Sequence, residues 1–152
     1  MLSITVVTWG LVKEEFVLYK LELVNEIASS LVGIPFLKGG RDPKVGLDCY
    51  GLCKTLCLHL GVELPEQESP EEREDIDAVV QGEKEHFVKL TSIEPLAIVV
   101  FAIRPPYESH VGIVLPDRRR FIHTSRSVGC SIEKLDAPFW AKRVRGFYKW
   151  TP

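Results

Sequence analysis

The most informative segment of the chain reads Gly46-Leu47-Asp48-Cys49-Tyr50-Gly51-Leu52-Cys53, and it predicts the start of a helix. Apolar residues recur from there at positions 49, 52, 53, 56, 57 and 60, which is the spacing of one face of an amphipathic helix. Asp48 is a favourable N-cap residue, and Gly61 stands where such a helix would end. The segment therefore places Cys49 in the first turn of a helix.

A thiol in that position has two interpretations. The N-terminus of a helix presents unpaired N–H groups and the positive end of the helix dipole, and both stabilise the thiolate that attacks carbonyl carbon. Cys49 is therefore a candidate nucleophile. The alternative is that Cys49 is a small core residue, because free cysteine is among the residue types most often buried.

Two histidines further along the chain favour the nucleophile. The segments 107–115 and 121–125 have the pattern of two strands of a hairpin, joined by a turn. His110 lies in the first strand and His123 in the second, so antiparallel pairing can bring them side by side. A nucleophile, a base and a residue that orients the base are the components of an activated thiol. Taken singly, each histidine is more simply explained as an ordinary residue at a strand end.

The remaining pattern predicts an α+β fold. A helix is expected over residues 14–31, followed by a Gly/Pro-rich loop over 33–46 and then by the helix that carries Cys49. Strands are expected at 98–103, 128–135 and 144–150, in addition to the histidine hairpin. Helices followed by a run of strands indicate helices packed on an antiparallel sheet.

Seven short segments, in this order and spacing, resemble a known family. They read Gly33-Ile34-Pro35-Phe36, Gly39-Gly40, Gly46 to Leu52, Gly61-Val62-Glu63-Leu64-Pro65, His110-Val111-Gly112-Ile113-Val114, Phe121-Ile122-His123-Thr124 and Arg145-Gly146-Phe147-Tyr148-Lys149. The family is that of the NlpC-type papain-like cysteine peptidases of bacterial cell walls. The segment Gly40-Arg41-Asp42-Pro43 is most similar to the phage-encoded, tail-associated branch.

The resemblance implies a papain-like fold, with N-terminal helices and the nucleophile helix packed on a C-terminal antiparallel sheet. It implies that Cys49 is the nucleophile, His110 the general base and His123 the residue that orients the base. It further implies that Asp48, Tyr50 and Phe36 bind substrate. For Asp48, this means holding the free amine of a stem peptide, although capping the helix is the simpler role.

The implied activity is hydrolysis of amide bonds in peptidoglycan stem peptides, between γ-D-glutamyl and the diamino acid. The implied partners are the peptidoglycan peptide and a phage tail or another protein that delivers the enzyme. Two other functions stay open. One is a thiol acyltransferase on the same fold, since fold does not determine reaction. The other is a tail-assembly protein that keeps the triad without turnover.

Phe36 departs from the family pattern. Members usually have tyrosine there, and its hydroxyl is expected to help stabilise the oxyanion. Loss of one oxyanion donor costs about 2.7–4 kcal/mol of transition-state stabilisation in a related enzyme. The strand before His110 also lacks its usual Gly-Asp start and reads Pro95-Leu96-Ala97, a change that we expect to alter a turn.

Composition predicts one folded domain over residues 1–152. The chain is 45% hydrophobic and 26% charged, which is enough for a single core. Its formal net charge of −2 gives no general attraction to nucleic acid. Residues 66–86 are expected to be an acidic surface insertion, while basic residues gather in 117–150. That basic region suits an anionic wall polymer or a substrate carboxylate, or it is simply a solvated face.

The cysteines do not predict a metal or a cofactor. Cys49, Cys53 and Cys57 follow one face of a helix, where they cannot bridge one another, and the spacing lacks the paired C-x2-C of structural zinc. Cys53 and Cys57 are expected to be core residues, and Cys130 to be either buried or near the site.

Residues 1–13 are expected to be an N-terminal extension or an extra strand. The segment lacks the basic start and the cleavage site of a signal peptide, and it is too short to span a membrane. The sequence leaves the localisation unknown. We expect synthesis in the cytoplasm and action either in a virion or outside the cell.

Overall fold

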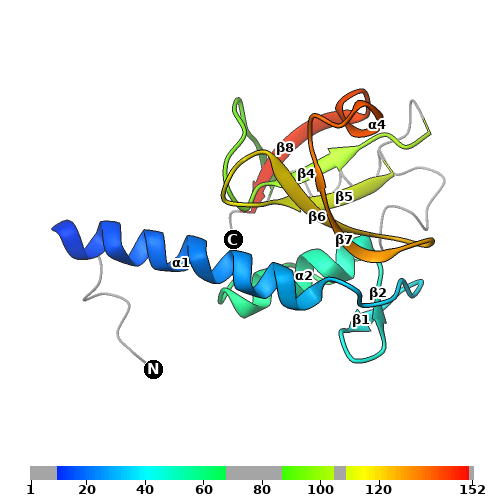
Figure 1. Ribbon diagram of the computed structural model, residues 1–152, viewed down its shortest axis with the longest axis horizontal. Helices are drawn as coiled ribbons and strands as arrows, with labels where there is room; N and C mark the ends of the chain where they lie inside the picture. The colour runs from blue at the N-terminus through cyan, green and yellow to red at the C-terminus, as the bar shows by residue number, and fades with distance from the viewer. Residues whose placement is uncertain (1–9, 68–86, 105–108, 151–152) are drawn as a thin grey trace.

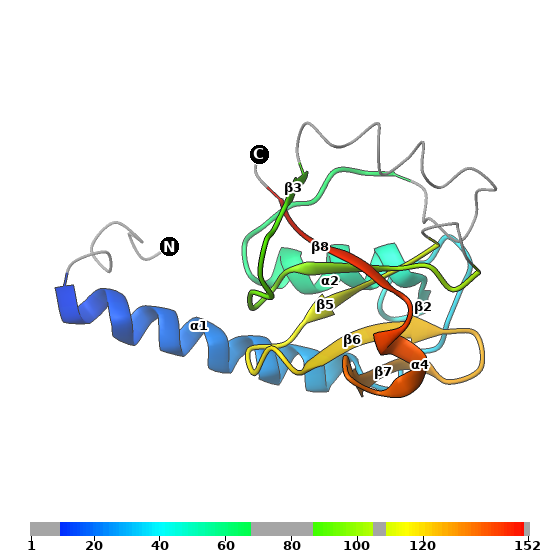
Figure 2. The ribbon, with the colours of Figure 1, turned by 90° about the horizontal axis from the view of Figure 1, so that it is seen from above.

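Residues 10–67, 87–104 and 109–150 are described by the structure, which is a computed structural model. They form a six-stranded antiparallel sheet with helices packed against it (Figures 1 and 2). The helices of this part of the chain are α1 (Gly10–Leu31), α2 (Cys49–His59) and α4 (Pro138–Ala141). The predicted α+β architecture, with the cysteine helix packed on a C-terminal antiparallel sheet, is confirmed.

The main sheet brings together segments that are distant in the sequence. Its spatial order is β3-β8-β4-β5-β6-β7. The strands are β3 (Phe87–Lys89), β8 (Val144–Trp150), β4 (Ile98–Phe101), β5 (His110–Val114), β6 (Arg120–Ser125) and β7 (Gly129–Lys134). A separate small hairpin pairs β1 (Arg41–Asp42) with β2 (Gly46–Leu47) and lies beside the start of α2 (Figure 1).

Alternating side chains of the sheet build two apolar cores, one on each face. Ile98 and Val100 of β4 belong to the core shared with α1 and α2, because residues two apart point to the same face. Val99 and Phe101 belong to the second core, together with Trp140 of α4. The whole of β4 is therefore buried, as a central strand covered on both faces should be.

Several expected boundaries are corrected by the structure. The first helix begins at Gly10, so residues 10–13 are helical and do not form an extra strand, while residues 1–9 lie outside the described residues. The loop expected over 33–46 contains β1 and most of the hairpin it forms with β2. Strand β3 was not predicted at all. Of the expected acidic insertion over 66–86, only residues 66 and 67 are described.

Candidate active site

The N-terminus of α2 is built around Asp48. This residue has extended backbone angles (φ −90°, ψ −179°), and its Oδ1 accepts a hydrogen bond from the Gly51 N–H at 2.7 Å. It is therefore the N-cap that the sequence predicts. Cys49 is the first residue of the helix and is fully buried. The helix packs against β5 and β6, the strands that carry His110 and His123.

Glycine at position 51 permits the chain to pass close to the start of α2. A Cβ atom on Gly51 would lie 2.0 Å from the carbonyl oxygen of Gly40, a separation that no real side chain tolerates. Gly40 is equally restricted, because its Cβ would lie 2.3 Å from the carbonyl oxygen of Gly46. The two glycines thus hold the β1–β2 hairpin against the helix that carries Cys49.

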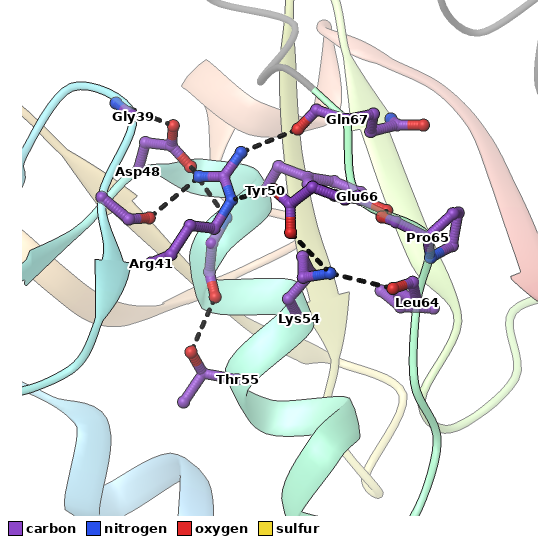
Figure 3. A network of polar contacts seen from close by, with 12 residues as sticks. Gly39, Arg41, Asp48, Tyr50, Lys54, Thr55, Leu64, Pro65, Glu66 and Gln67 are labelled. Carbon is purple, nitrogen blue, oxygen red and sulfur yellow. Dashed lines mark hydrogen bonds and ion pairs between the residues drawn. The ribbon is translucent and has the colours of Figure 1, made fainter.

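Arg41 connects this hairpin to Asp48 and to the chain beyond α2 (Figure 3). Its Nη1 donates to Asp48 Oδ1 at 2.7 Å, its Nε donates to Glu66 Oε1 at 3.1 Å, and its Nη2 donates to the Gln67 carbonyl at 2.8 Å. Burial lowers the pKa of Arg41, but the hydrogen bonds and charges of Asp48 and Glu66 outweigh it and raise the pKa above its usual value. Arg41 therefore stays charged and joins three segments.

Lys54 and Tyr50 tie α2 to the same stretch of chain. Lys54 Nζ lies 3.0 Å from Glu66 Oε2 and donates to the Leu64 carbonyl at 2.9 Å (Figure 3). The hydrogen bond from Lys54, followed by that from Arg41, lowers the pKa of Glu66 despite slight burial. The Tyr50 hydroxyl donates to the Pro65 carbonyl at 2.6 Å. Glu66 is thus exposed, as expected of a surface segment, and also ion-paired with Arg41 and Lys54.

Two of the residues predicted to bind substrate are engaged in this network. Asp48 is only 1% exposed, and its carboxylate accepts from Gly51, from Arg41 and, through Oδ2, from the Gly39 N–H at 3.1 Å. The Tyr50 side chain is buried as well. These contacts support a structural role for Asp48 and Tyr50 at the start of the helix that carries Cys49. Holding a substrate amine stays a prediction for Asp48.

Replacing Asp48 by alanine is expected to lower the free energy of unfolding by about 2–4 kcal/mol, because the change removes the helix cap and leaves the half-buried Arg41 partly unpaired. Asp48→Asn should cost less, since the amide oxygen can still cap the helix. Urea unfolding measures both. The control is Asp42→Asn in the same hairpin, where the carboxylate is exposed and a change below about 0.5 kcal/mol is expected. Equal stability of Asp48→Ala and Asp42→Asn would contradict this role.

The structure brings the two histidines together. His110 Nε2 and His123 Nδ1 lie 2.9 Å apart, a hydrogen-bond distance, and the two rings are nearly perpendicular. His110 is 6% exposed and His123 is 1% exposed. The pairing of β5 with β6 produces this contact, because it aligns Ile113 with Ile122 and Val114 with Phe121. The hairpin predicted from the sequence therefore forms and juxtaposes both rings.

Aromatic side chains enclose the histidine pair. Trp140 of α4 stacks on His110 at 5.8 Å between ring centroids and meets His123 edge-on at 4.7 Å. Phe101 from β4 and Phe121 from β6 complete the wall. A hydrogen bond in such a low-dielectric pocket is stronger than one in water. Sequence reasoning missed Trp140, because the four-residue helix that positions it has no detectable period.

Glu133 and Ser131 of β7 reach the far side of His123. Glu133 Oε2 accepts a hydrogen bond from His123 Nε2, and Ser131 Oγ lies 3.5 Å from the same nitrogen. Neither residue was predicted. The register of the β6–β7 hairpin would have indicated both residues. It pairs His123 with Ser131 and Phe121 with Glu133. Alternate residues share a face of a strand, so Glu133 is the diagonal neighbour of His123.

The other cysteines are unsuited to act as nucleophiles. Burial raises the pKa of Cys53 well above its usual value and raises that of Cys57 to about 12. Burial also raises the pKa of Cys130. These three thiols stay protonated at neutral pH, and the thiolate is the reactive form. Among the described residues, no group of His, Cys, Asp and Glu side chains is arranged to hold a metal ion.

Phe36 lies beside the segment that leads into α2. It forms an isolated parallel bridge with Leu47, and the guanidinium of Arg126 lies over its ring at 4.7 Å from the centroid. Phe36 is half-buried and Arg126 is exposed. The position predicted to be near the oxyanion therefore has a cation above the ring. This contact joins residues 90 positions apart and could not be read from the sequence.

Comparison with known proteins gives one family. The model of the NlpC/P60 family matches residues 33–149. The chain is 32% identical over 127 residues to the "Gamma-DL-glutamyl hydrolase" of Bacillus subtilis (strain 168), covering 81% of this chain and 28% of that protein. The chain thus spans little more than a quarter of this curated relative.

Solved structures of the same family share the fold. An NLP/P60 family protein from Staphylococcus aureus, described as similar to a lipoprotein, superposes with a TM-score of 0.61 at 20% identity, over 86% of this chain and 41% of that one. The NlpC/p60 domain of the peptidoglycan hydrolase SagA superposes with a TM-score of 0.56 at 18% identity, over 84% of this chain and 96% of that one.

No helix in the described part of the chain is long and apolar enough to cross a membrane.

Proposed function

Because the chain belongs to the NlpC/P60 family, we propose that it is a cysteine hydrolase that cleaves amide bonds in peptidoglycan stem peptides. The observation that carries this proposal is the buried contact between His110 Nε2 and His123 Nδ1 at 2.9 Å, on strands against which the Cys49 helix packs. A base held by a second polar ring, on strands that contact a helix beginning with a thiol, supplies the three kinds of group that nucleophilic catalysis needs.

In the proposed reaction His110 takes the proton of the Cys49 thiol, and the thiolate attacks the scissile carbonyl carbon. Backbone N–H groups at the start of α2 stabilise the resulting oxyanion. The carbon–nitrogen bond then breaks, and the leaving amine receives the proton held by His110. A water molecule, deprotonated by His110, attacks the thioester, releases the carboxylate product and restores the thiol.

The proposed bond lies between γ-D-glutamyl and the diamino acid of the stem peptide. Two comparisons support this choice: one relative is named a γ-DL-glutamyl hydrolase, and one protein of the same fold is named a peptidoglycan hydrolase. A γ-glutamyl residue carries a free α-carboxylate beside the scissile amide. Delivery by a phage tail stays a prediction that rests on the resemblance alone.

Digestion of purified sacculi tests the proposal. Mass spectrometry of the soluble fragments is expected to show new γ-D-glutamyl carboxyl ends and free amines on the diamino acid, absent from a parallel digest with Cys49→Ala. Transfer of the acyl group to an added amine, with no hydrolysis, would show an acyltransferase. The absence of both products with well-folded protein would overturn the proposal.

Replacing Phe36 by tyrosine is expected to raise kcat, because a hydroxyl placed beside the oxyanion acts mainly in the transition state. A tenfold increase corresponds to about 1.4 kcal/mol. The measurement is kcat, KM and melting temperature, with Phe87→Tyr at the edge of the sheet as control. Unchanged turnover with a lower melting temperature would show that Phe36 only packs beneath Arg126.

A further inference from the structure

The histidine pair continues into a third group, Glu133, which the proposed mechanism does not use. Glu133 lies on β7, and its carboxylate oxygen Oε2 meets His123 Nε2. Its side chain is 41% exposed, whereas that of His123 is 2% exposed. The carboxylate is therefore partly open to solvent, whereas the ring that it contacts is buried. The three groups form a chain of contacts in the order Glu133, His123, His110.

The carboxylate determines the direction of the hydrogen bonds between these groups. An ionised carboxylate only accepts, so His123 must carry its proton on Nε2. A neutral imidazole has one N–H, so His123 Nδ1 then carries a lone pair that can only accept. His110 must therefore donate from Nε2 across the 2.9 Å contact. This leaves the Nδ1 lone pair of neutral His110 available to take a proton from a thiol.

If the hydrogen bond between the two histidines ran in the opposite direction, His110 could not act as the base. If His123 carried its proton on Nδ1, it would donate to His110 Nε2, and the proton of neutral His110 would move to Nδ1. That ring could no longer accept a proton at Nδ1. Ser131 cannot prevent this arrangement, because a hydroxyl 3.5 Å from His123 Nε2 can donate as well as accept. The acceptor-only carboxylate of Glu133 is what excludes it.

The negative charge of Glu133 also offsets the cost of a buried imidazolium. The pair is walled by Phe101 of β4, Phe121 of β6 and Trp140 of α4, none of which carries a charge. A desolvated pocket of this kind disfavours the charged imidazole that proton transfer from Cys49 of α2 creates. A carboxylate bonded to the outer ring favours that charged form.

We propose that Glu133 is a positioning residue that selects the active tautomer of His123 and supports the imidazolium of His110 during catalysis. This inference rests on the proposed function. No net proton moves to Glu133: the proton taken from Cys49 stays on His110 Nδ1 until the leaving amine receives it. Glu133 acts only through the hydrogen bond to His123.

Two substitutions test the effects of tautomer and charge. Glu133→Ala removes the carboxylate entirely, and kcat/KM is expected to fall by about 10- to 100-fold, the loss seen when the carboxylate that orients a metal-ligating histidine is removed. Glu133→Gln keeps an oxygen that can accept from His123 Nε2 but adds an N–H2 group that can donate to it, so its rate at the pH optimum should lie between those of the wild type and Glu133→Ala. In both variants both limbs of the kcat/KM profile, the alkaline limb included, should move to lower pH, because loss of a nearby negative charge favours the deprotonated forms of the coupled thiol–imidazole pair.

The control is Glu94→Gln, which removes the same charge from an exposed side chain on the loop before β4. Neither the rate nor the alkaline limb should change there. If Glu133→Ala leaves both at the wild-type values, the inference is overturned. A lower rate with a lower melting temperature and an unmoved alkaline limb would show a merely structural role, which also overturns it.

Nitrogen NMR of the histidine rings gives a readout that does not depend on activity. In the wild type, the His123 signals should show a protonated Nε2 and an unprotonated Nδ1, with His123→Gln used for assignment. Glu133→Ala should shift both signals toward the other tautomer, and unchanged signals would contradict the inference. If Cys49→Ala keeps full activity, the proposed function fails instead, whatever Glu133 does.

Discussion

Replacing Cys49 by alanine is expected to abolish hydrolysis while the protein stays folded. Removal of the nucleophile from a serine protease costs about 10⁶-fold in kcat, and we expect a loss on that scale here. The reason is chemical: burial raises the pKa of the Cys53 and Cys57 thiols, so neither can replace the missing thiolate. The measurement is release of fragments from sacculi, with a thermal melt to verify folding.

The matched control for Cys49 is Cys53→Ala, one turn later on the same helix and equally buried. This change leaves a small cavity and should lower stability by about 1–2 kcal/mol without affecting kcat/KM. Both variants therefore leave a small cavity in the core, but only Cys49→Ala should lose activity. Activity retained in Cys49→Ala, or lost in Cys53→Ala with the fold intact, would refute the assignment of Cys49.

His110 and His123 are expected to contribute unequally. His110→Ala removes the base, and kcat should fall by about 10⁶-fold, the scale seen when the triad histidine of a serine protease is removed. His123→Gln should retain partial activity, because the amide oxygen can accept from His110 Nε2 while the amide N–H donates to Glu133. Wild-type kcat/KM should show a bell-shaped pH profile whose limbs belong to the coupled thiol–imidazole pair.

His59→Ala controls for the loss of an imidazole elsewhere. This histidine is exposed at the end of α2, and its Nδ1 contacts the Thr55 carbonyl. Its replacement should leave kcat/KM and the pH profile unchanged. If His123→Gln proves as inactive as His110→Ala while remaining folded, His123 takes part directly in the chemistry and does not merely orient the base.

The local sequence pattern was sufficient to predict the helix that carries Cys49 and the strands that carry His110 and His123. The apolar spacing from Cys49, the cap at Asp48 and the stop at Gly61 define α2, and Gly61 has the positive φ of 81° that ends a helix. The short, largely apolar runs around His110 and His123, separated by a turn, likewise predict two neighbouring strands. These features depend on residues close in sequence, which is why they could be predicted without knowledge of the fold.

The long-range contacts depended on the tertiary structure. The pairing of β3 with the end of β8 joins Phe87 to Trp150, and three residues at a sheet edge carry no recognisable period. The contacts of Arg41 with Asp48 and Glu66 depend on how the β1–β2 hairpin meets the chain beyond α2. An ion pair between distant residues is specified by where the backbone brings them, and a charge pattern alone cannot show that.

Around the site, the sequence was enough to place Cys49 at the start of a helix and His110 and His123 on neighbouring strands, because these placements depend on local pattern. The residues that surround the two histidines were determined by how β7 and α4 pack in the tertiary structure. Glu133 reaches His123 only through the register of one hairpin, and Trp140 covers both rings because α4 returns across the sheet. A side chain's partner across a sheet is set by register and chain path, and a shift of one residue would turn Glu133 to the opposite face.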